Sequence, residues 1–318
     1  MSKNTPWPLY KTDIDAEYKI SRVLGSGSTA IVYKAKERAK PHRRVALKCI
    51  KKRAMEKHSE VIENEIGFLK ARSNEYLVSL LTIHHFDGCP VLVFEAAAGN
   101  LHDMVEAQLY LMDKILCQSI IRQILRGLIY IHSEGYIHGD IKLGNLLVGY
   151  DKKIKIADFG YCCKIADAEK GIVPLNGTPE FIPPECFIEK KWNETFDIWS
   201  LGIVTFVLLT KKYPFKVRHS KDLPKFKKNL KQVAEDGGFD WEELSAKYTK
   251  LPKDSIPFLN HLLNPEYKKR LSAKTCLGLK WIDVSKSLTK NKSYGISKLI
   301  QRWKKPSSEE SSSSSGQL

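Results

Sequence analysis

Two different hydrophobic periodicities occupy the first quarter of the chain. Residues 18–50 alternate apolar and polar side chains around a glycine cluster, which predicts strands joined by a tight turn. Residues 55–72 instead place Ile62, Ile66 and Leu69 at spacings of four, three and seven, the repeat of one helix face. The pattern therefore predicts a small β-rich unit that includes one amphipathic helix.

Helical patterns dominate farther along. Residues 90–96 are a short apolar run that predicts a buried strand, and residues 112–132 predict a long amphipathic helix. Beyond residue 185 every strong pattern is helical. The longest apolar run, residues 198–210, has 13 residues, whereas a bilayer needs about 20, so it predicts a buried helix with no membrane span. The expected fold class is α+β, with a small β-rich front and a large helical back.

Composition limits the compartment and the partners. The formal net charge is +16, and residues 211–231 hold nine Lys or Arg against one acid. No zinc finger, aromatic–glycine RNA motif or recognition-helix pattern accompanies this charge, so nucleic acid is not expected as the primary partner. Seven cysteines without a C-x-x-C spacing indicate reduced thiols, which favours the cytoplasm or the nucleus.

Phosphate chemistry is first suggested by the stretch LGSGSTAIVYKA at 24–35. Gly25 and Gly27 would let backbone amides approach phosphate oxygens, although a glycine-rich hairpin is equally consistent with a plain turn. Lys48 follows on an otherwise apolar strand, where an ammonium group needs an anionic partner. Glu65 shares the helix face of Ile62 and Leu69, so it is the expected partner, whereas Glu63 points about 100° away from Ile62.

A family resemblance comes from these motifs together with HGDIKLGN, DFG, GTPEFIPPE, DIWSLG and Arg270, which follow in order along the chain. Over residues 18–282 the chain resembles a eukaryotic protein kinase of the Ser/Thr type. The resemblance implies a bilobal fold with an N-lobe at about 18–95 and a C-lobe at about 96–282. Residues 1–17 would be an N-terminal extension, and residues 283–318 a basic amphipathic segment followed by a disordered serine-rich tail.

The resemblance also implies roles for individual residues. Asp140 would orient the acceptor hydroxyl, Lys142 would neutralise the transferred phosphoryl group, and Lys48 paired to Glu65 would hold the ATP phosphates. Asn145 and Asp158 would bind Mg²⁺. The expected ATP-binding residues, which run from the glycine loop through the hinge, are Leu24, Gly25, Ser26, Gly27, Ser28, Thr29, Ala30, Ile31, Val32, Ala46, Lys48, Glu95, Ala97 and Leu147.

Two alternatives remain open. The sequence His-Gly-Asp with a following Gly-Asn is also similar to small-molecule phosphotransferases of the aminoglycoside-kinase type. Three features favour a protein acceptor: Lys142, the peptide-docking segment GTPEFIPPE that contains Thr178, and the pair Glu185 and Arg270. Small-molecule phosphotransferases generally lack this peptide-docking apparatus. A pseudokinase scaffold is the other alternative, and the presence of Lys48, Asp140 and Asp158 favours an active enzyme.

Gly139 departs from the family pattern. Protein kinases usually have an arginine there, which binds a phosphate on the activation loop. Residues 161–182 contain only two hydroxyl side chains, Tyr161 and Thr178, and residues 172–176 contain none. Both halves of the usual phosphate latch are absent, so we expect activity without activation-loop phosphorylation.

Substrate and tail give weaker indications. Asn100 and Gly144 stand where kinases that prefer basic peptides carry acids, and the cationic stretch 211–231 favours acidic protein substrates by charge complementarity, although it could equally be a solvated face. Residues 290–306 place Ile296, Leu299 and Trp303 on one face among lysines and arginines. Such a segment could bind calmodulin, lie on an acidic membrane, or dock on its own domain, which is the expectation.

Overall fold

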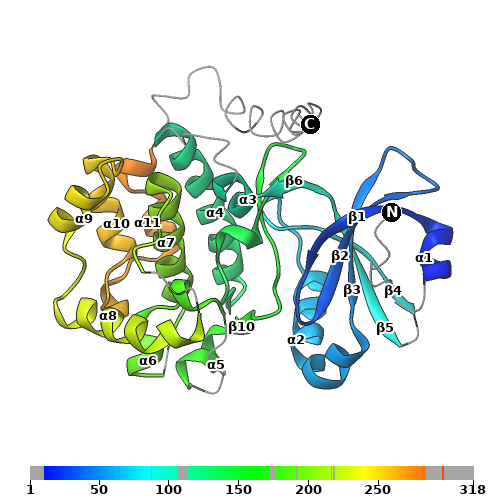
Figure 1. Cartoon of the computed structure of the whole chain (residues 1–318), viewed down its shortest axis with the longest axis horizontal. Coiled ribbons are helices and arrows are strands. Elements are labelled where there is room, and N and C mark those ends of the chain that lie inside the picture. Colours follow the sequence, from blue (N-terminus) through cyan, green and yellow to red (C-terminus); the bar gives the residue numbers. More distant parts are fainter. Residues whose placement is uncertain are drawn as a thin grey trace, which may run out of the picture.

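A computed structural model describes residues 11–86, 88–106, 114–171, 177–190, 192–215, 217, 219–283 and 296. It has two lobes: a small one built on a five-stranded antiparallel sheet, and a large one built mainly of helices (Figure 1). The expected bilobal α+β fold is therefore confirmed.

Within the described residues the strands form three sheets, with orders β1-β2-β3-β5-β4, β10-β7 and β6-β8-β9. Their bounds are β1 Tyr18–Ser26, β2 Ala30–Glu37, β3 Arg44–Ile50, β4 Leu80–Phe86, β5 Cys89–Glu95, β6 Ala97–Asn100, β7 Tyr136–Ile137, β8 Leu146–Gly149, β9 Ile154–Ile156 and β10 Cys163–Lys164. In the large sheet Lys48 is opposite Val32 on one side and Leu92 on the other, so the lysine comes from the middle of the sheet.

The α-helices are α1 Lys11–Glu17, α2 Lys52–Ala71, α3 Leu101–Glu106, α4 Lys114–Ser133, α5 Ile165–Glu169, α6 Pro184–Ile188, α7 Thr195–Thr210, α8 Leu223–Glu235, α9 Trp241–Lys247, α10 Ile256–Leu262 and α11 Ala273–Leu277. Short 3₁₀ helices are η1 Leu143–Asn145, η2 Pro179–Phe181, η3 Ser220–Asp222, η4 Lys253–Ser255, η5 Tyr267–Lys269 and η6 Lys280–Ile282. The long helices α2 and α4 fall where the 3.6-residue periodicity predicts them.

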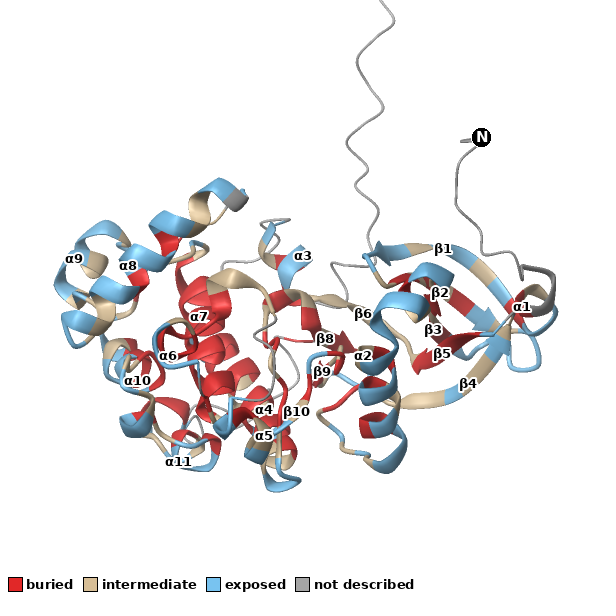
Figure 2. Cartoon of the chain, turned by 90° about the horizontal axis from the view of Figure 1, so that it is seen from below, coloured by how far each residue is buried: buried red, intermediate tan, exposed pale blue. Residues whose placement is uncertain are grey.

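In the small lobe, α2 lies at the side of the sheet that is nearer the large lobe (Figures 1 and 2). Ile62, Glu65 and Leu69 are buried on α2, while Glu63 is exposed, so the helix has the predicted phase. The helix bends at His58, whose dihedral angles leave the helical range (φ −139°, ψ 29°). Its buried face positions Glu65 toward the sheet.

The large lobe is organised around α7, in which every residue is buried. Figure 2 shows this helix in the middle of the lobe, with exposed surface on α8 and α9 toward the outside. The apolar run at 198–210 is thus a central helix, as predicted. Among the residues that the structure describes, no helix combines the length and apolar character needed to cross a bilayer.

Predictions about the two ends fall almost entirely outside the described residues. The serine-rich tail and residues 290–306 lie there, with the exception of Ile296. Ile296 is buried and belongs to the same apolar cluster as Trp281 and Ile282. At the other end, Ile14 on α1 is buried against the small-lobe sheet, so residues 11–17 are packed onto the first lobe.

Candidate active site

A cavity of about 390 Å³ lies between the two lobes. Its walls come from the first three strands, from the connection between β5 and α3, and from the segments around η1 and β9. The lining residues are Arg22, Leu24, Gly25, Val32, Ala46, Lys48, Glu65, Val78, Phe94, Glu95, Ala97, Ala98, Gly99, Asn100, Asp103, Gly144, Asn145, Leu147, Ala157 and Asp158. Apolar side chains predominate away from the charged end, so the cavity suits a ligand with an apolar face and an anionic end.

The charged end is organised by Lys48. Its Nζ donates to both carboxylate oxygens of Glu65 at 2.7 Å and to Oδ1 of Asp158 at 3.1 Å. Burial alone would lower the pKa of Lys48, but the two carboxylates raise it above its usual range, so the ammonium stays charged. Burial alone would raise the pKa of the Asp158 carboxyl, but the positive charge of Lys48 outweighs this effect and lowers the pKa. Both groups are therefore ionised at neutral pH.

Glu65 is almost fully buried, and burial raises its pKa while the Lys48 ammonium opposes this. A buried carboxylate is tolerated only when it is paired with a cation and hydrogen-bonded. Lys48 meets both needs, because its ammonium group donates to both oxygens of Glu65. The pair therefore links the position of α2 to the position of Lys48 on β3.

The segment between β7 and η1 presents Asp140. Its Oδ2 accepts from Asn145 Nδ2 at 2.9 Å and forms an ion pair with Lys142 Nζ at 2.6 Å. Its Oδ1 accepts from the backbone N–H of Thr178 at 3.2 Å and from the Thr178 hydroxyl at 3.1 Å. Lys142 also donates to that hydroxyl at 2.9 Å. Thr178 is consequently held by the site through three hydrogen bonds.

The backbone of this segment is fixed by a residue whose role the sequence did not reveal. Asp197, at the start of α7, accepts from the N–H groups of His138 at 2.9 Å and Gly139 at 3.0 Å, and contacts His132 Nε2 at 2.8 Å. Its side chain is fully buried. The central helix thereby orients the residues on either side of Asp140, although the sequence showed Asp197 only as part of a motif.

Asn145 and Asp158 suit a hard metal ion. The Asn145 amide nitrogen donates to the backbone oxygen and to Oδ2 of Asp140, both at 2.9 Å, which leaves its carbonyl oxygen as the group that can act as a ligand. Asp158 has a φ of +68°, a left-handed conformation uncommon outside glycine. Both residues line the cavity, and oxygen donors of this kind are what Mg²⁺ prefers.

Gly139 occupies a position that requires glycine in this arrangement. Its φ is +78°, and a Cβ atom built there would lie 2.7 Å from the backbone oxygen of Tyr161. Real Cβ atoms do not come so close to a backbone oxygen, so any side chain would push the two segments apart. The close approach joins the Asp140 segment to the residue that follows Asp158-Phe159-Gly160.

The glycine-rich loop is only partly represented in the cavity wall. Leu24, Gly25 and Val32 line the cavity, while residues 26–31 do not. Within that group Ala30 and Ile31 are buried in apolar clusters of the small lobe. The phosphate-binding role of residues 26–31 stays a prediction. Conversely, Val78, Ala157 and Asp103 line the cavity and were not anticipated, because no motif marks them and their placement depends on tertiary packing.

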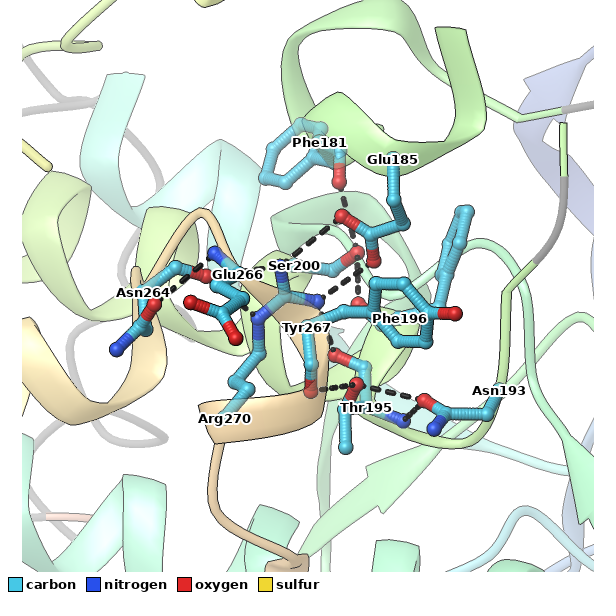
Figure 3. A network of polar contacts seen from close by, with 10 residues as sticks. All are labelled: Phe181, Glu185, Asn193, Thr195, Phe196, Ser200, Asn264, Glu266, Tyr267 and Arg270. Atoms are coloured by element: carbon cyan, nitrogen blue, oxygen red, sulfur yellow. Dashed lines mark hydrogen bonds and ion pairs between the residues drawn. The ribbon is translucent and has the colours of Figure 1, made fainter. Parts of the chain in front are cut away.

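A second ion pair stabilises the segment that follows Thr178 (Figure 3). Arg270 Nη1 and Nη2 donate to the two oxygens of Glu185 at 2.8 and 3.0 Å. The remaining guanidinium hydrogens bond to the backbone oxygens of Asn264 and Thr195 at 2.9–3.0 Å. Ser200 on α7 donates to the backbone oxygen of Phe181 at 2.8 Å. The docking segment predicted from the sequence is thus anchored to the centre of the large lobe.

This fold, with an interlobe cavity lined by the Lys48–Glu65 pair and by Asn145 and Asp158, defines a phosphotransferase of the kinase type. Asp140 does not line the cavity but is bonded to Asn145 beside it. The protein kinase domain model matches residues 18–282. The chain belongs to the protein kinase family, and it is a serine/threonine protein kinase.

Curated relatives agree with this assignment. The chain is 31% identical to the rat calcium/calmodulin-dependent protein kinase type 1B over 91% of this chain and 82% of the relative. It is 30% identical to a calcium/calmodulin-dependent protein kinase type 1 of Macrobrachium nipponense, over 91% and 81% of the two chains. A probable myosin light chain kinase of Dictyostelium discoideum is 29% identical over 86% and 76%.

Proposed function

We propose that this kinase transfers the γ-phosphoryl group of Mg²⁺-bound ATP to serine or threonine hydroxyls of proteins, and that it does so without activation-loop phosphorylation. The observation that carries the catalytic part is that Lys48, Asn145 and Asp158 all line one interlobe cavity, many of whose other lining residues are apolar. Asp140 bonds directly to Asn145 and so lies beside that cavity.

Each of these residues has a task that follows from its charge and position. Leu24, Val32, Ala46 and Leu147 supply the apolar walls for an adenine ring, with the backbone of Glu95 and Ala97 beside them. Lys48, held by Glu65, offers a fixed positive charge to the α- and β-phosphates. Asn145 and Asp158 supply the oxygen ligands for Mg²⁺, which when bound neutralises phosphate charge. The protein's contribution is mainly positioning and electrostatics.

Asp140 is the group that handles the acceptor. Its carboxylate would orient the incoming hydroxyl and take the proton as the bond to phosphorus forms. Lys142 is 2.6 Å from one Asp140 oxygen, close enough to offset negative charge that develops during transfer. Thr178 bonds both groups, so the docking segment and the reacting residues are held in register.

A transfer assay tests the catalytic proposal. Purified protein with Mg²⁺ and [γ-³²P]ATP should label a generic protein acceptor, and Asp140→Asn should lower the rate by about 10²–10⁴-fold. An aminoglycoside supplied as the competing acceptor should stay unlabelled. If the wild type transferred no phosphate while still binding ATP, the pseudokinase alternative would hold. Labelling of the aminoglycoside instead would identify a small-molecule phosphotransferase.

Independence from activation-loop phosphorylation is supported by a second cavity, of about 490 Å³, between α2 and the segment after Asp158. Gly139 and Cys163 line it, and Lys164 is the one cationic side chain among the lining residues. Glu60, Glu63 and Asp167 line it too. A phosphate placed there would meet three carboxylates and no arginine, so the cavity lacks what a phosphate latch needs.

Phosphatase treatment tests this part separately. Fully dephosphorylated protein should keep its transfer rate within about twofold, since no charge-assisted contact would be lost. Loss of activity together with a phosphate mapped to residues 161–182 would contradict the proposal. Autophosphorylation elsewhere would leave it intact, which mass spectrometry distinguishes.

Acidic acceptor proteins are the proposed substrate class. Lys225, Lys227, Lys228 and Lys231 are exposed along α8. Asn100 and Gly144 stand at the two positions where, by the family resemblance, kinases that prefer basic peptides carry acids. A positional peptide array should show no preference for arginine upstream of the acceptor. A clear arginine preference would refute this substrate class.

Residues 290–306 are proposed to contact the kinase's own large lobe and to bind calmodulin, on which the names of two relatives say that those proteins depend. The buried Ile296 in the large-lobe cluster supports the intramolecular contact. Calcium-dependent retention on calmodulin resin, lost when Trp303 is changed to alanine, would establish calmodulin binding. Absence of retention would leave the intramolecular contact alone.

Cytoplasmic or nuclear residence is proposed from the seven cysteine thiols, none of which is in a disulfide. Imaging of the tagged full chain tests it. Accumulation in the secretory pathway would contradict it.

A further inference from the structure

Arg72 follows the last residue of α2, at one of the contacts between the small lobe and the large one. Its guanidinium carbon is 4.5 Å from the ring centroid of Tyr136 and 5.0 Å from that of Phe68. Its Nε donates to Glu134 at 3.2 Å, and its side chain is only 16% exposed. One arginine thus contacts its own helix through Phe68 and the large lobe through Tyr136 and Glu134, at separations typical of cation–π contacts.

The contacts continue inward to the reacting residues. Phe68 stacks on Phe159 with ring centroids 4.6 Å apart and planes 17° apart. Phe159 in turn meets His138 edge-on at 5.0 Å. An unbroken series of aromatic contacts therefore connects Arg72 to the residues beside Asp158 and Asp140.

Phe68 and Glu65 are three residues apart on α2, and side chains at that spacing lie on neighbouring parts of one helix face. Fixing Phe68 against Phe159 therefore also fixes the rotation of α2 that directs Glu65 to Lys48. An arrangement of this kind performs the task that a phosphorylated activation loop performs elsewhere, because it holds α2 against the large lobe. It needs no phosphate.

We propose that Arg72 is a positioning residue that keeps α2 and Phe159 in the catalytically competent arrangement in the unphosphorylated enzyme. This inference rests on the proposed function, because it supplies a physical cause for activity without activation-loop phosphorylation. Arg72 touches no reacting atom. It acts through Phe68 and Tyr136. Its removal should weaken the contact of α2 with the large lobe and leave the rest of the fold unchanged.

The test compares four dephosphorylated full-length proteins: wild type, Arg72→Met, Arg72→Lys, and Lys70→Met as the matched control. Methionine retains an unbranched apolar stem but no charge, and Lys70 is an exposed cation in the last turn of the same helix. We expect Arg72→Met to lower kcat about tenfold with the peptide KM unchanged, the factor expected when the two partly buried cation–π contacts of Arg72 and its ion pair are lost. Arg72→Lys should retain an intermediate rate, and Lys70→Met the full rate.

Hydrogen exchange provides a readout that does not depend on activity. Arg72→Met should speed exchange in residues 61–72 and 158–164, while the amides of α7 and α10 keep their wild-type protection. A kcat within twofold of wild type with unchanged exchange would overturn the proposal. Faster exchange throughout the protein would also overturn it, because it would show general destabilisation.

The two proposals can fail independently. If phosphatase treatment silenced the wild type, activity without phosphorylation would be wrong, and the exchange comparison would still decide whether Arg72 holds α2. If the wild type stayed active and Arg72→Met did too, only the role of Arg72 would be wrong.

Discussion

The ion pair in the cleft and the ion pair inside the large lobe have nearly the same geometry and very different surroundings. Lys48 and Glu65 are 2.7 Å apart, and Arg270 and Glu185 are 2.8 Å apart. All five guanidinium hydrogens of Arg270 have acceptors, and neither partner of that pair is exposed beyond 2%. Lys48 is 15% exposed, lines a cavity and shares its charge with Asp158.

The difference in exposure and in hydrogen bonding distinguishes a pair that stabilises the fold from a pair that can bind a ligand. An arginine whose donors are saturated has nothing left to offer a ligand, and it holds two segments together through five bonds. A lysine between two carboxylates at a cavity wall can exchange one of them for a phosphate at low cost. Loss of the first pair should therefore affect folding, while loss of the second should affect catalysis.

Breaking the Arg270–Glu185 pair should have the largest effect on stability. Arg270→Met would leave the Glu185 carboxylate buried without a partner, and we expect the free energy of unfolding to fall by roughly 3–5 kcal/mol. Urea denaturation followed by circular dichroism measures this. Lys269→Met is the matched control, because that lysine is 68% exposed and should cost under about 0.5 kcal/mol. Equal losses in the two variants would contradict the comparison.

Lys48→Met should give the opposite profile. We expect the transfer rate to fall by about 10³-fold, because a fixed positive charge on the ATP phosphates is removed. The midpoint of thermal unfolding should fall less than in Arg270→Met, because burial already raises the pKa of Glu65 and so eases its protonation once Lys48 is gone. Lys36→Met, at an exposed position on β2, should leave both quantities unchanged. A variant that failed to fold would place Lys48 among the structural anchors.

These two predictions also indicate how far the sequence could be used. The choice of Glu65 over Glu63 followed from helical phase alone, because the apolar face of α2 fixes which side is buried, and the structure agrees. The pair Glu185 and Arg270 came from the family resemblance. Asp197 could be recognised as the first residue of the DIWSLG motif, but its hydrogen bonds to the His138 and Gly139 amides depend on how α7 packs.

Other features depend on backbone approach that no periodicity reports. From the sequence, Gly139 could be noticed only because protein kinases usually have an arginine at this position. The structure adds that the backbone oxygen of Tyr161 lies too close for a Cβ atom at residue 139. Phe68 could not be distinguished from other apolar residues on α2, because stacking on Phe159 requires the two lobes to be in place. The ATP-binding role of residues 26–31 was implied by the family resemblance, and the cavity wall includes only their neighbours Gly25 and Val32.

A conservative change of the cleft pair sharpens the comparison further. Glu65→Gln keeps the shape and one acceptor oxygen, so Lys48 loses a charge-assisted bond and keeps a neutral one. We expect kcat to fall by about tenfold, equivalent to the difference between charged and neutral hydrogen bonds. Steady-state kinetics measure it, and Glu63→Gln at the exposed neighbouring position is the control. An unchanged kcat in Glu65→Gln would mean that the charge of Glu65 is not needed to hold Lys48.

The smallest effect concerns Asp158 and the dependence of stability on pH. Because Lys48 lowers the pKa of Asp158 below its ordinary value of 3.8, the contribution of their ion pair is fully present above that pH and is lost only as the pH falls through the lowered value. Asp158 is 44% exposed, so the contribution should be under about 1 kcal/mol. Asn tolerates the positive φ at this position, so Asp158→Asn removes the charge without backbone strain. The difference in unfolding free energy between wild type and variant should stay constant from pH 7 to about pH 4 and shrink toward zero below it. A difference that already disappeared between pH 7 and pH 5 would show that Asp158 takes up a proton far above its expected range, and that Lys48 is paired with Glu65 alone.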